Sequence, residues 1–269
     1  MKRLILDLRG GLGNQLFQIC GAMNYAEKLD MELIVDDSGI RRHSDKTRRN
    51  WSKKYQLEEM FNFQNLVWIH PLTIFTSTRR VSKKLDHPLT EIELNKIKEY
   101  KKDIRIRDWF YTKEYSLKRN VKALPPKNLS KKCIREVERV SRNNRIAAIH
   151  MRFGDFKATS WGVLPDRWYL DAINRITEQG IEHLEVYTDD IGEASRILSY
   201  ANKTISLKFP EQKEVFLPHE LLWLLSHYEV FISSNSSLSW WASFLEPNGM
   251  KQIICTWQES LKMDNWELV

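Results

Sequence analysis

The chain has 269 residues, of which 42% are hydrophobic and 11% aromatic, and its formal net charge is +7. This apolar content supports a folded core and excludes disorder over the whole chain. Its three cysteines, Cys20, Cys133 and Cys255, are widely spaced and form no CxxC pair, so neither a disulfide framework nor a structural zinc site is expected. The positive charge suits an anionic partner without choosing between nucleotide, phosphorylated lipid, membrane surface and nucleic acid.

The beginning of the sequence predicts a strand over 3–8, a glycine-rich turn over 9–13, a helix over 14–29 and a second strand over 32–35. This succession is typical of a parallel α/β sheet. Asp7 and Arg9 interrupt the first apolar run, which is therefore too short for a signal peptide. No stretch approaches the roughly 20 apolar residues of a membrane helix. We expect a cytoplasmic protein, attached at most to the inner face of a membrane.

The middle of the chain gives weaker patterns. Residues 39–55 are rich in Lys, Arg and His and indicate a solvated basic loop, or one that touches an acceptor or an anionic membrane. From residue 130 onward, strands and helices alternate. The predicted helices cover 130–141, 166–179, 191–200, 220–226 and a segment from 238, and the predicted strands cover 146–151, 184–188, 230–233 and 253–256.

These elements predict an α/β protein with two lobes. Residues 1–140 form an N-terminal lobe, and residues 141–256 form a C-terminal lobe with a doubly wound sheet. Residues 257–269 form a segment that can pack back on the first lobe.

The glycine turn contains Gly11 and Gly13 and is followed by Asn14 and Gln15. Glycines let the backbone approach a ligand closely, and amides at a helix start favour negative charge. The spacing fits neither the dinucleotide fingerprint nor a phosphate-binding loop ending in Gly-Lys-Ser/Thr. A tight turn is the simpler alternative. Two carboxamides directly after it favour a binding site, because they are useful hydrogen-bonding groups.

A second motif, His150 to Asp155, follows the predicted strand over 146–151 and includes Arg152. Ligands bind at this edge of open α/β sheets, and an arginine there can grip a phosphate with two hydrogen bonds. Asp155 can hold that arginine, and a buried salt bridge without a ligand is the structural alternative. The order His, Arg, Gly, Asp at a strand end favours a site.

The third motif comprises Asn235, Ser236 and Ser237, between a strand and a helix. Hydroxyls and free amides at a helix N-terminus can bind an anion, although they can equally cap the helix. Trp240 and Trp241, just beyond, are predicted to be core residues.

Two acidic features remain. Glu220 at a helix start can accept hydrogen bonds from guanine, although a glutamate in a first turn is ordinary. Asp189-Asp190 can hold a metal or can cap the next helix.

Four segments together resemble a known family. They are GGLGNQLFQ at 10–18, HMRFGDF at 150–156, VYTDD at 186–190 and SNSSLSWWASFL at 234–245. Their order and sequence are similar to those of the inverting α-1,2-fucosyltransferases, glycosyltransferase family 11, and more distantly to protein O-fucosyltransferases and α-1,6-fucosyltransferases. The resemblance implies a GT-B-like fold with two Rossmann-like lobes facing across a cleft. It implies that the lobe of residues 1–140 lies on the acceptor side and that the lobe of residues 141–256 binds the GDP-sugar. It further implies GDP-β-L-fucose as the donor, inversion at the anomeric carbon, and no cofactor or required metal.

The resemblance also assigns residues. It places the phosphate-gripping arginine at Arg152, with His150 and Asp155 beside it, and a reaction-centre asparagine at Asn14. The family's second arginine is Phe153 here, which is a departure. The donor-binding residues that the motifs and the resemblance indicate are Gly11, Gly13, Arg152, Glu220, Asn235, Ser236 and Ser237.

The expected reaction transfers fucose to the 2-hydroxyl of a galactoside in a glycan, such as a lipid-linked bacterial surface polysaccharide. Arg152, the 236–237 helix start and the 11–13 amides would stabilise charge on the leaving phosphate. His150 and Asp155 are both candidates for the general base, and the choice stays open.

Three alternatives remain. One is another GDP-sugar transferase or a protein O-fucosyltransferase, and a second is an inactive sugar-nucleotide-binding protein. The third is a basic nucleic-acid-binding protein, supported by the 41–54 cluster. The absence of a helix-turn-helix, zinc or RRM signature argues against the third, so no nucleic-acid partner is expected.

Overall fold

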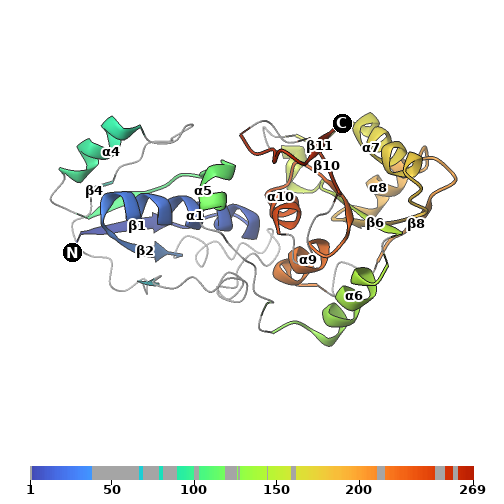
Figure 1. Ribbon diagram of the computed structural model, residues 1–269, viewed down its shortest axis with the longest axis horizontal. Helices are drawn as coiled ribbons and strands as arrows, with labels where there is room; N and C mark the ends of the chain where they lie inside the picture. The colour runs from blue at the N-terminus through green and yellow to red at the C-terminus, as the bar shows by residue number, and fades with distance from the viewer. Residues whose placement is uncertain are drawn as a thin grey trace. The chain divides into compact units, whose positions relative to one another are not determined.

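The computed structural model divides the chain into two compact units, Met1–Leu124 and Pro125–Val269. Each is an α/β unit around a parallel sheet (Figure 1). The structure describes residues 2–37, 67–68, 79–80, 90–99, 103–118, 126, 128–143, 145–158, 162–210, 216–245, 252–256 and 260–269. The predicted basic loop at 39–55, with its 41–54 cluster, lies outside the described residues.

The first unit has a five-stranded sheet in the order β3-β2-β1-β5-β4, and all its pairings are parallel. Its strands are β1 (Arg3–Asp7), β2 (Glu32–Asp36), β3 (Val67–Trp68), β4 (Arg79–Arg80) and β5 (Ile104–Ile106). Its helices are α1 (Leu12–Leu29), α4 (Glu91–Lys98) and α5 (Lys113–Lys118). The predicted β1–turn–α1–β2 unit is present, and α1 begins two residues earlier than expected, inside the glycine turn.

Helix α1 carries much of the core of the first unit. Fourteen of its 18 residues are buried, because it contacts β1 and β2 on one side and α4 and α5 on others. Gly21 lies where the chain after β5 crosses the helix, and a Cβ there would come within 2.2 Å of the Phe110 ring. This glycine therefore permits the close approach of two segments that are distant in sequence.

The second unit has a six-stranded parallel sheet in the order β11-β10-β9-β6-β7-β8. Its strands are β6 (Ile146–Met151), β7 (His183–Thr188), β8 (Ser206–Lys208), β9 (Val230–Ser233), β10 (Gln252–Cys255) and β11 (Glu267–Leu268). Its helices are α6 (Lys131–Ser141), α7 (Asp166–Glu178), α8 (Ile191–Leu198), α9 (Pro218–Leu225) and α10 (Ser237–Phe244), with the short 3-10 turn η2 (Asp155–Ala158).

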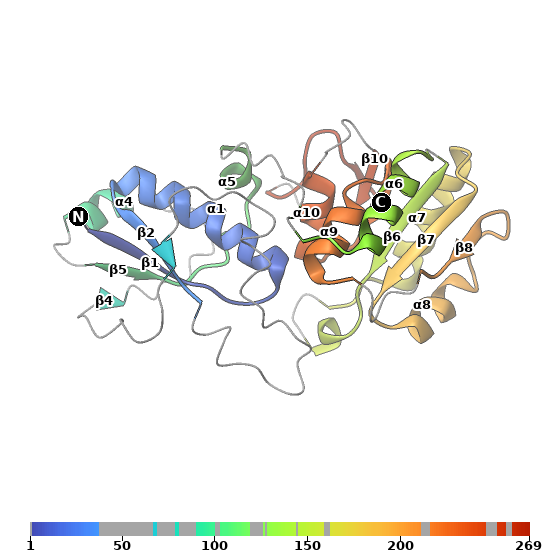
Figure 2. The ribbon, with the colours of Figure 1, turned by 90° about the horizontal axis from the view of Figure 1, so that it is seen from below.

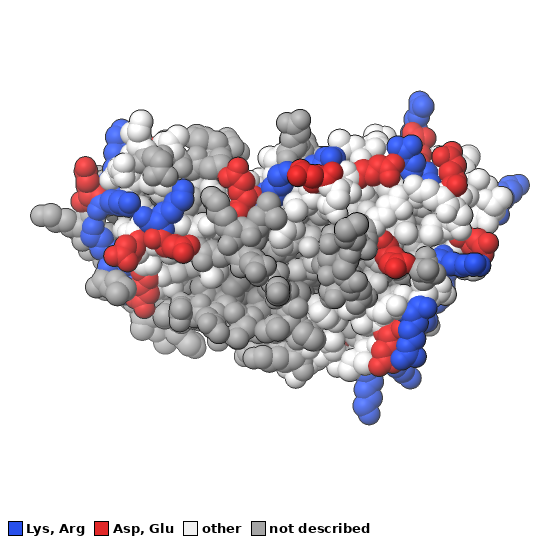
Figure 3. Space-filling model, viewed as in Figure 1, with Lys and Arg blue, Asp and Glu red and all other residues white. Residues whose placement is uncertain are grey.

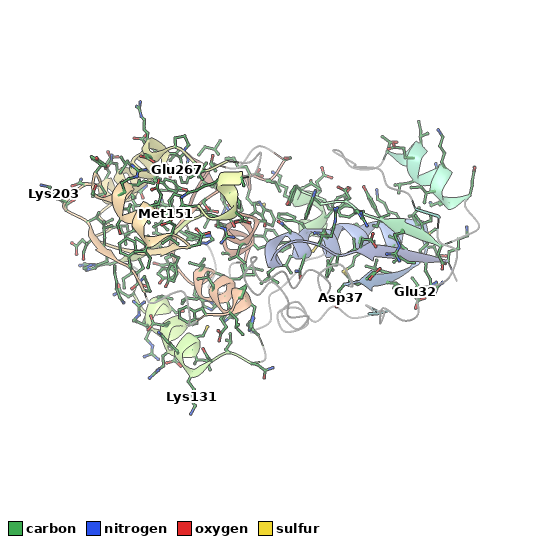
Figure 4. All side chains as sticks on the ribbon, turned by 180° about the vertical axis from the view of Figure 1, so that it is seen from behind. Glu32, Asp37, Lys131, Met151, Lys203 and Glu267 are labelled. Carbon is green, nitrogen blue, oxygen red and sulfur yellow. The ribbon has the colours of Figure 1, made fainter. Side chains whose placement is uncertain are left out.

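Helices cover both faces of this sheet, as Figure 2 shows. Residues Ile149 and Val186 point into a core formed with α7 and α8, while α6, α9 and α10 contact one another on the other face. Met151 ends β6 inside this unit, and Lys131 projects outward from the first turn of α6 (Figure 4). Trp240 and Trp241 are fully buried, which confirms their predicted place in the core.

The division between the units lies after Leu124 and not after residue 140, where the sequence analysis set it. The reason is that α6 contacts α9 and forms part of the second unit. The buried Cys133 thiol lies 3.7 Å from the Glu220 carbonyl oxygen, and Arg139 pairs with the buried Glu185.

The end of the chain also differs from the expectation that 257–269 can pack on the first lobe. In the second unit, β11 pairs with β10, and Trp168 donates a hydrogen bond to the Val269 carbonyl oxygen at 2.8 Å. The described part of this segment therefore completes the second sheet.

Charged side chains of both signs lie next to one another on the surface shown in Figure 3. In the second unit, Arg196 forms ion pairs with both Asp166 and Glu193. No helix among the described residues is both long enough and apolar enough to cross a bilayer. The cysteines are buried and free.

Candidate active site

Three of the predicted motifs emerge at the same edge of the second sheet. Strands are added from β6 to β7 and β8 on one side, and then from β9 to β10 and β11 on the other. The order therefore reverses between β6 and β9, and ligands bind at the carboxyl ends of strands beside such a reversal. Residues 152–155 follow β6, residues 189–190 follow β7, and residues 234–237 follow β9.

Arg152 is held between two carboxylates. Its Nη2 donates to Asp155 Oδ1 at 2.6 Å, and its Nη1 lies 3.0 Å from Asp189 Oδ2. The Arg152 side chain is 21% exposed. A guanidinium oriented in this way, and still partly open to solvent, is suited to bind a phosphate group. The structure thus brings together Arg152 and Asp155, as the sequence predicts.

Asp189 supports the loop that carries Arg152. Its second oxygen, Oδ1, accepts a hydrogen bond from the Phe153 amide at 2.9 Å. A Cβ at Gly154 would lie 2.4 Å from Asp189 Oδ2, so only glycine leaves room for this carboxylate. The sequence allows Asp189 to be a metal ligand or a helix cap. In the structure it instead binds the Arg152 guanidinium and the Phe153 amide.

Asp190 takes the capping role. Its Oδ1 accepts a hydrogen bond from the Glu193 amide at 3.0 Å, at the start of α8. The two adjacent acids are thus engaged by different protein groups. Among the residues that the structure describes, no group of three or more His, Cys, Asp or Glu side chains is arranged to hold a metal ion.

Phe153 explains the departure from the fucosyltransferase pattern. Its side chain is fully buried in the core beneath α7, with its ring centroid 6.1 Å from that of Tyr169. Burying a phenylalanine side chain stabilises a fold by about 1.5–3 kcal/mol. The position of the family's second arginine is therefore a core position here, and Arg152 provides the guanidinium at this loop.

His150 is placed differently from a general base. It is 4% exposed, and its Nδ1 lies 2.5 Å from Ser239 Oγ, which in turn lies 3.2 Å from Ser234 Oγ. Burial, together with the positive charge of Arg152, lowers the pKa of His150 to about 4. A neutral, enclosed imidazole that binds α10 positions this helix against β6. Of the two candidate bases, the more exposed Asp155 is the one accessible to a substrate.

The start of α10 carries Ser236, which is buried at 6% exposure, and Ser237, which is partly exposed. Ser236 occupies the N-cap position, yet its side chain makes no capping hydrogen bond, and Ser237 is the first residue of the helix. Asn235 Nδ2 donates to the Gly162 carbonyl oxygen at 3.1 Å. Helix capping by the Ser236 hydroxyl, the alternative that the sequence left open, is thus not observed. Free amides at an eight-residue helix start remain suited to an anion.

Glu220 differs from the predicted guanine-binding carboxylate. It is 3% exposed, and its two oxygens accept hydrogen bonds from the Ser130 amide at 2.7 Å and the Leu217 amide at 2.9 Å. It therefore joins the starts of α6 and α9. A glutamate in a first helical turn is readily bound by nearby backbone amides, and here this structural role replaces ligand recognition.

In the first unit, the glycine turn is held in place by two glutamines of α1. The Gln18 side chain accepts a hydrogen bond from the Arg9 amide at 3.0 Å and donates to the Arg9 carbonyl oxygen at 2.7 Å. Gln15 donates to the Gly10 carbonyl oxygen at 2.8 Å. Gly10 has a φ of 75°, which favours glycine, Gly11 is the N-cap of α1, and Gly13 is buried inside the helix.

Asn14 is oriented by a residue that the sequence analysis did not find. Its Oδ1 accepts a hydrogen bond from the Tyr111 hydroxyl at 3.0 Å, which leaves the Nδ2 group to donate elsewhere. Burial raises the pKa of Tyr111, so the phenol stays protonated as a donor. Trp109 stacks on Tyr111 with ring centroids 6.0 Å apart. The aromatic run 109–111, three residues after the alternating Ile-Arg-Ile segment 104–106, was the available signal for this cluster.

The candidate residues therefore fall into two groups, one in each unit. Gly11, Gly13 and Asn14 lie at the carboxyl end of β1 in the first unit. His150, Arg152, Asp155, Asn235, Ser236 and Ser237 share the carboxyl edge of the second sheet, and Glu220 serves the helix starts of that unit.

Known proteins similar to this chain are sugar transferases. No family model matches the sequence. An alpha-1,2-colitosyltransferase from Escherichia coli is 25% identical, and the alignment covers 91% of this chain and 88% of the relative.

Among solved structures, POFUT1 in complex with GDP-fucose superposes with a TM-score of 0.51 at 10% identity, covering 94% of this chain and 97% of POFUT1. The α-1,6-fucosyltransferase NodZ soaked with GDP-fucose gives 0.51 at 13% identity, with 92% and 94% covered. An Arabidopsis thaliana FUT1 variant in complex with GDP gives 0.56 at 14% identity, with 98% and 71% covered. The chain thus has the GT-B-like α/β fold of these fucosyltransferases, with two Rossmann-like lobes.

Proposed function

We propose that this protein is a glycosyltransferase that moves fucose, or the related sugar colitose, from a GDP-sugar to a hydroxyl group of a glycan. The observation that carries the proposal is the geometry of Arg152, held by Asp155 and Asp189 at the strand-order reversal of the second sheet. Two findings support it. The similarity to a colitosyltransferase extends over nearly the whole chain, and the fold is that of transferases whose structures contain GDP-fucose or GDP.

The chemistry follows from the charge that develops in the reaction. Breaking the bond between sugar and diphosphate leaves negative charge on the β-phosphate and a positive, oxocarbenium-like sugar. Preorganised donors aimed at the leaving group are usually the largest contribution to such a step. In this proposal Arg152 supplies that charge, and the Ser236 and Ser237 hydroxyls and amides at the start of α10 bind the same phosphate oxygens.

The finer proposal is an inverting α-1,2 transfer from GDP-β-L-fucose to the 2-hydroxyl of a galactoside. Asn14 Nδ2 binds a substrate oxygen, and Asp155 is the accessible acid that accepts the acceptor proton, once substrate displaces it from Arg152. The acceptor is a glycan, such as a lipid-linked surface polysaccharide at the inner face of the membrane. No metal is assigned a role, because Asp189 and Asp190 already serve Arg152 and the start of α8.

The test is GDP release from GDP-fucose, GDP-colitose, GDP-mannose and UDP-galactose, with lactose as acceptor, in buffer with EDTA and in buffer with Mg²⁺. The variant Arg152→Ala is compared with Arg167→Ala, because Arg167 is an exposed arginine of α7 bound to Asp171 on its own helix. Product analysis by NMR then gives the linkage and the anomeric configuration.

We expect release with GDP-fucose or GDP-colitose that survives EDTA and falls at least about 100-fold in Arg152→Ala, with Arg167→Ala unchanged. Product with retained configuration, or transfer to another hydroxyl, would reject the finer proposal alone. If neither GDP nor a GDP-sugar raises the melting temperature of the wild-type protein, the transferase proposal is wrong. A salt-sensitive gel shift with nucleic acid would then favour the alternative that the protein binds nucleic acid.

A further inference from the structure

Arg9, in the first unit, carries a guanidinium group that has no hydrogen-bonding or ionic partner among the described residues. Within the described part of the chain, this group forms no hydrogen bond and no ion pair, and its Nε is buried and unsatisfied. Its contact is with the Trp109 ring, whose centroid lies 4.7 Å from the guanidinium carbon. An unsatisfied buried polar group costs about 1–3 kcal/mol, so this arrangement lowers stability unless something else binds the group.

The backbone of Arg9 is nevertheless held firmly. The fully buried Gln18 side chain binds both its amide and its carbonyl oxygen, and Gln15 binds the next carbonyl oxygen, that of Gly10. A side chain without a partner on a backbone held this way is preorganised, so it would lose little conformational freedom when a ligand binds.

The two acidic residues that act on Arg9 through space are bound to other groups. Asp7 pairs with Arg105 and Arg107, and Asp108 Oδ1 accepts a hydrogen bond from the Trp109 amide at 2.6 Å. Asp7 and Asp108 raise the pKa of Arg9 through space, against the stronger lowering by burial and by Arg107. These carboxylates therefore influence Arg9 without pairing with it.

The position of Arg9 is one where ligands bind. In the first sheet, β2 and β3 lie on one side of β1, and β5 and β4 lie on the other. Arg9 follows β1, and Trp109 and Tyr111 follow β5, so the cluster lies at the carboxyl ends of the two strands where the order reverses. Asn14, which Tyr111 orients, belongs to the same cluster.

We propose that Arg9 is the anion-binding residue of a subsite in the first lobe, which takes a phosphate or carboxylate group of a substrate. The anion comes either from the diphosphate of the donor or from an acidic group on the acceptor. The assignment of the anion to a sugar donor or to an acceptor rests on the proposed function. Trp109 holds the planar guanidinium from one face, and the edge of the fork with its paired N–H groups binds the oxyanion.

The experiment compares Arg9→Gln and Arg9→Lys with the wild-type protein and with Arg107→Gln. Arg107 is a neighbouring arginine that is 51% exposed and already paired with Asp7, so it is the matched control. Titration calorimetry is done with inorganic pyrophosphate, GDP, guanosine, and lactose 1-phosphate in the presence of GDP. Melting temperatures are measured without ligand.

We expect Arg9→Gln to lose roughly tenfold or more in affinity for an anionic ligand, Arg9→Lys to lose less, and Arg107→Gln to stay within about twofold. Weaker binding of pyrophosphate and GDP with unchanged guanosine would identify the donor diphosphate. Weaker binding of lactose 1-phosphate with unchanged GDP would identify the acceptor. The melting temperature of Arg9→Gln should not fall by more than about 2 °C, because this guanidinium bonds to nothing in the described fold, and a rise is consistent with removal of an unsatisfied group.

The inference is overturned if Arg9→Gln binds all these ligands as the wild-type protein does, or if Arg107→Gln loses as much affinity. It is equally overturned if the wild-type protein binds none of the anions, or if Arg9→Gln mainly lowers the melting temperature. Failure of the proposed function has a different signature. The wild-type protein would then bind GDP no better than pyrophosphate, while the loss of pyrophosphate binding in Arg9→Gln would still support the anion subsite.

Discussion

At the scale of single residues, the bonding of the polar atoms separates candidate binding groups from structural ones. Arg152 and Glu220 are both charged residues of the second unit. Arg152 is oriented by two carboxylates yet remains partly exposed, whereas both oxygens of Glu220 are bound by backbone amides within the protein. Arg9 is the opposite case, because its backbone is held while its guanidinium bonds to no group in the part of the chain that the structure describes. Whether a charged group is free to bind a ligand is therefore shown by the bonds of its polar atoms and not by its residue type.

The depressed pKa of His150 predicts a specific loss of stability in acid. The folded protein binds this proton only near pH 4, whereas an unfolded histidine binds it near its ordinary pKa of about 6.5. The stability that the neutral His150 side chain contributes is therefore fully present above about pH 6.5 and is lost as the pH falls towards 4. His150→Asn removes this titration and is less stable at pH 7.5. We expect the difference in unfolding free energy to narrow by about 1–3 kcal/mol between pH 7.5 and 4.5.

Urea unfolding of both proteins at several pH values measures this difference. Other groups that titrate in this range act on both proteins and cancel in the comparison. Parallel pH profiles for the two proteins would show that the imidazole is not kept neutral by the fold.

Tyr111 is predicted to act through Asn14 and not by direct contact with the donor. Tyr111→Phe removes the hydroxyl that binds Asn14 Oδ1, so the carboxamide can rotate. A buried hydrogen bond of this kind contributes about 1 kcal/mol, and we expect kcat to fall roughly fivefold to tenfold. The dissociation constant for GDP should stay unchanged. Steady-state kinetics with GDP titration separate the two quantities, and an equal loss in GDP affinity would contradict a role in positioning.

At the scale of elements, the helical glycines show where another segment of the chain packs directly against a helix backbone. Gly21 of α1 faces Phe110 at a distance that excludes a Cβ, whereas a Cβ on Gly192 of α8 would meet only Asp190 Oδ1, at 3.6 Å. Both are helical glycines with ordinary φ values. The difference between them lies in the neighbouring segment and not in the helix itself.

This pair gives opposite predictions for the same substitution. Gly21→Ala should destabilise the protein by about 1–3 kcal/mol, because Phe110 must move out of a packed core. Gly192→Ala should stabilise it by up to about 1 kcal/mol, because alanine restricts the unfolded chain and fits the helix. Thermal unfolding of both variants is the measurement. Stabilisation by both would mean that the segment after β5 does not cross α1 as described.

At the scale of the whole molecule, the boundary between the lobes decides which fragments fold. Helix α6 supplies Arg139 to the buried Glu185, and the amide of Ser130, directly before α6, binds Glu220. A fragment that begins after residue 140 lacks these partners, so Glu185 keeps Lys208 as its ion-pair partner and Glu220 keeps the Leu217 amide. Each hydrogen bond to a charged group that is lost costs about 1.5–3 kcal/mol.

We therefore predict that residues 125–269 fold alone and that residues 141–269 do not. Circular dichroism during urea unfolding should show a cooperative transition for the longer fragment and none for the shorter one. Equal cooperativity in the two fragments would place the boundary where the sequence patterns suggested it.

The sequence by itself determined the α/β class, most elements of the second lobe to within two residues, and the loops that carry Asn14, Arg152 and Ser236. These are local properties, because apolar periodicity and turn residues act over a few positions. The tertiary structure decided what the sequence left open or assigned differently. In the structure, Glu220 and His150 are positioning residues, and Asp189 forms an ion pair with Arg152. Phe153 lies in the core, and α6 belongs to the second lobe. Each of these depends on a partner distant in the chain or on enclosure by the fold, and local patterns carry no information about either.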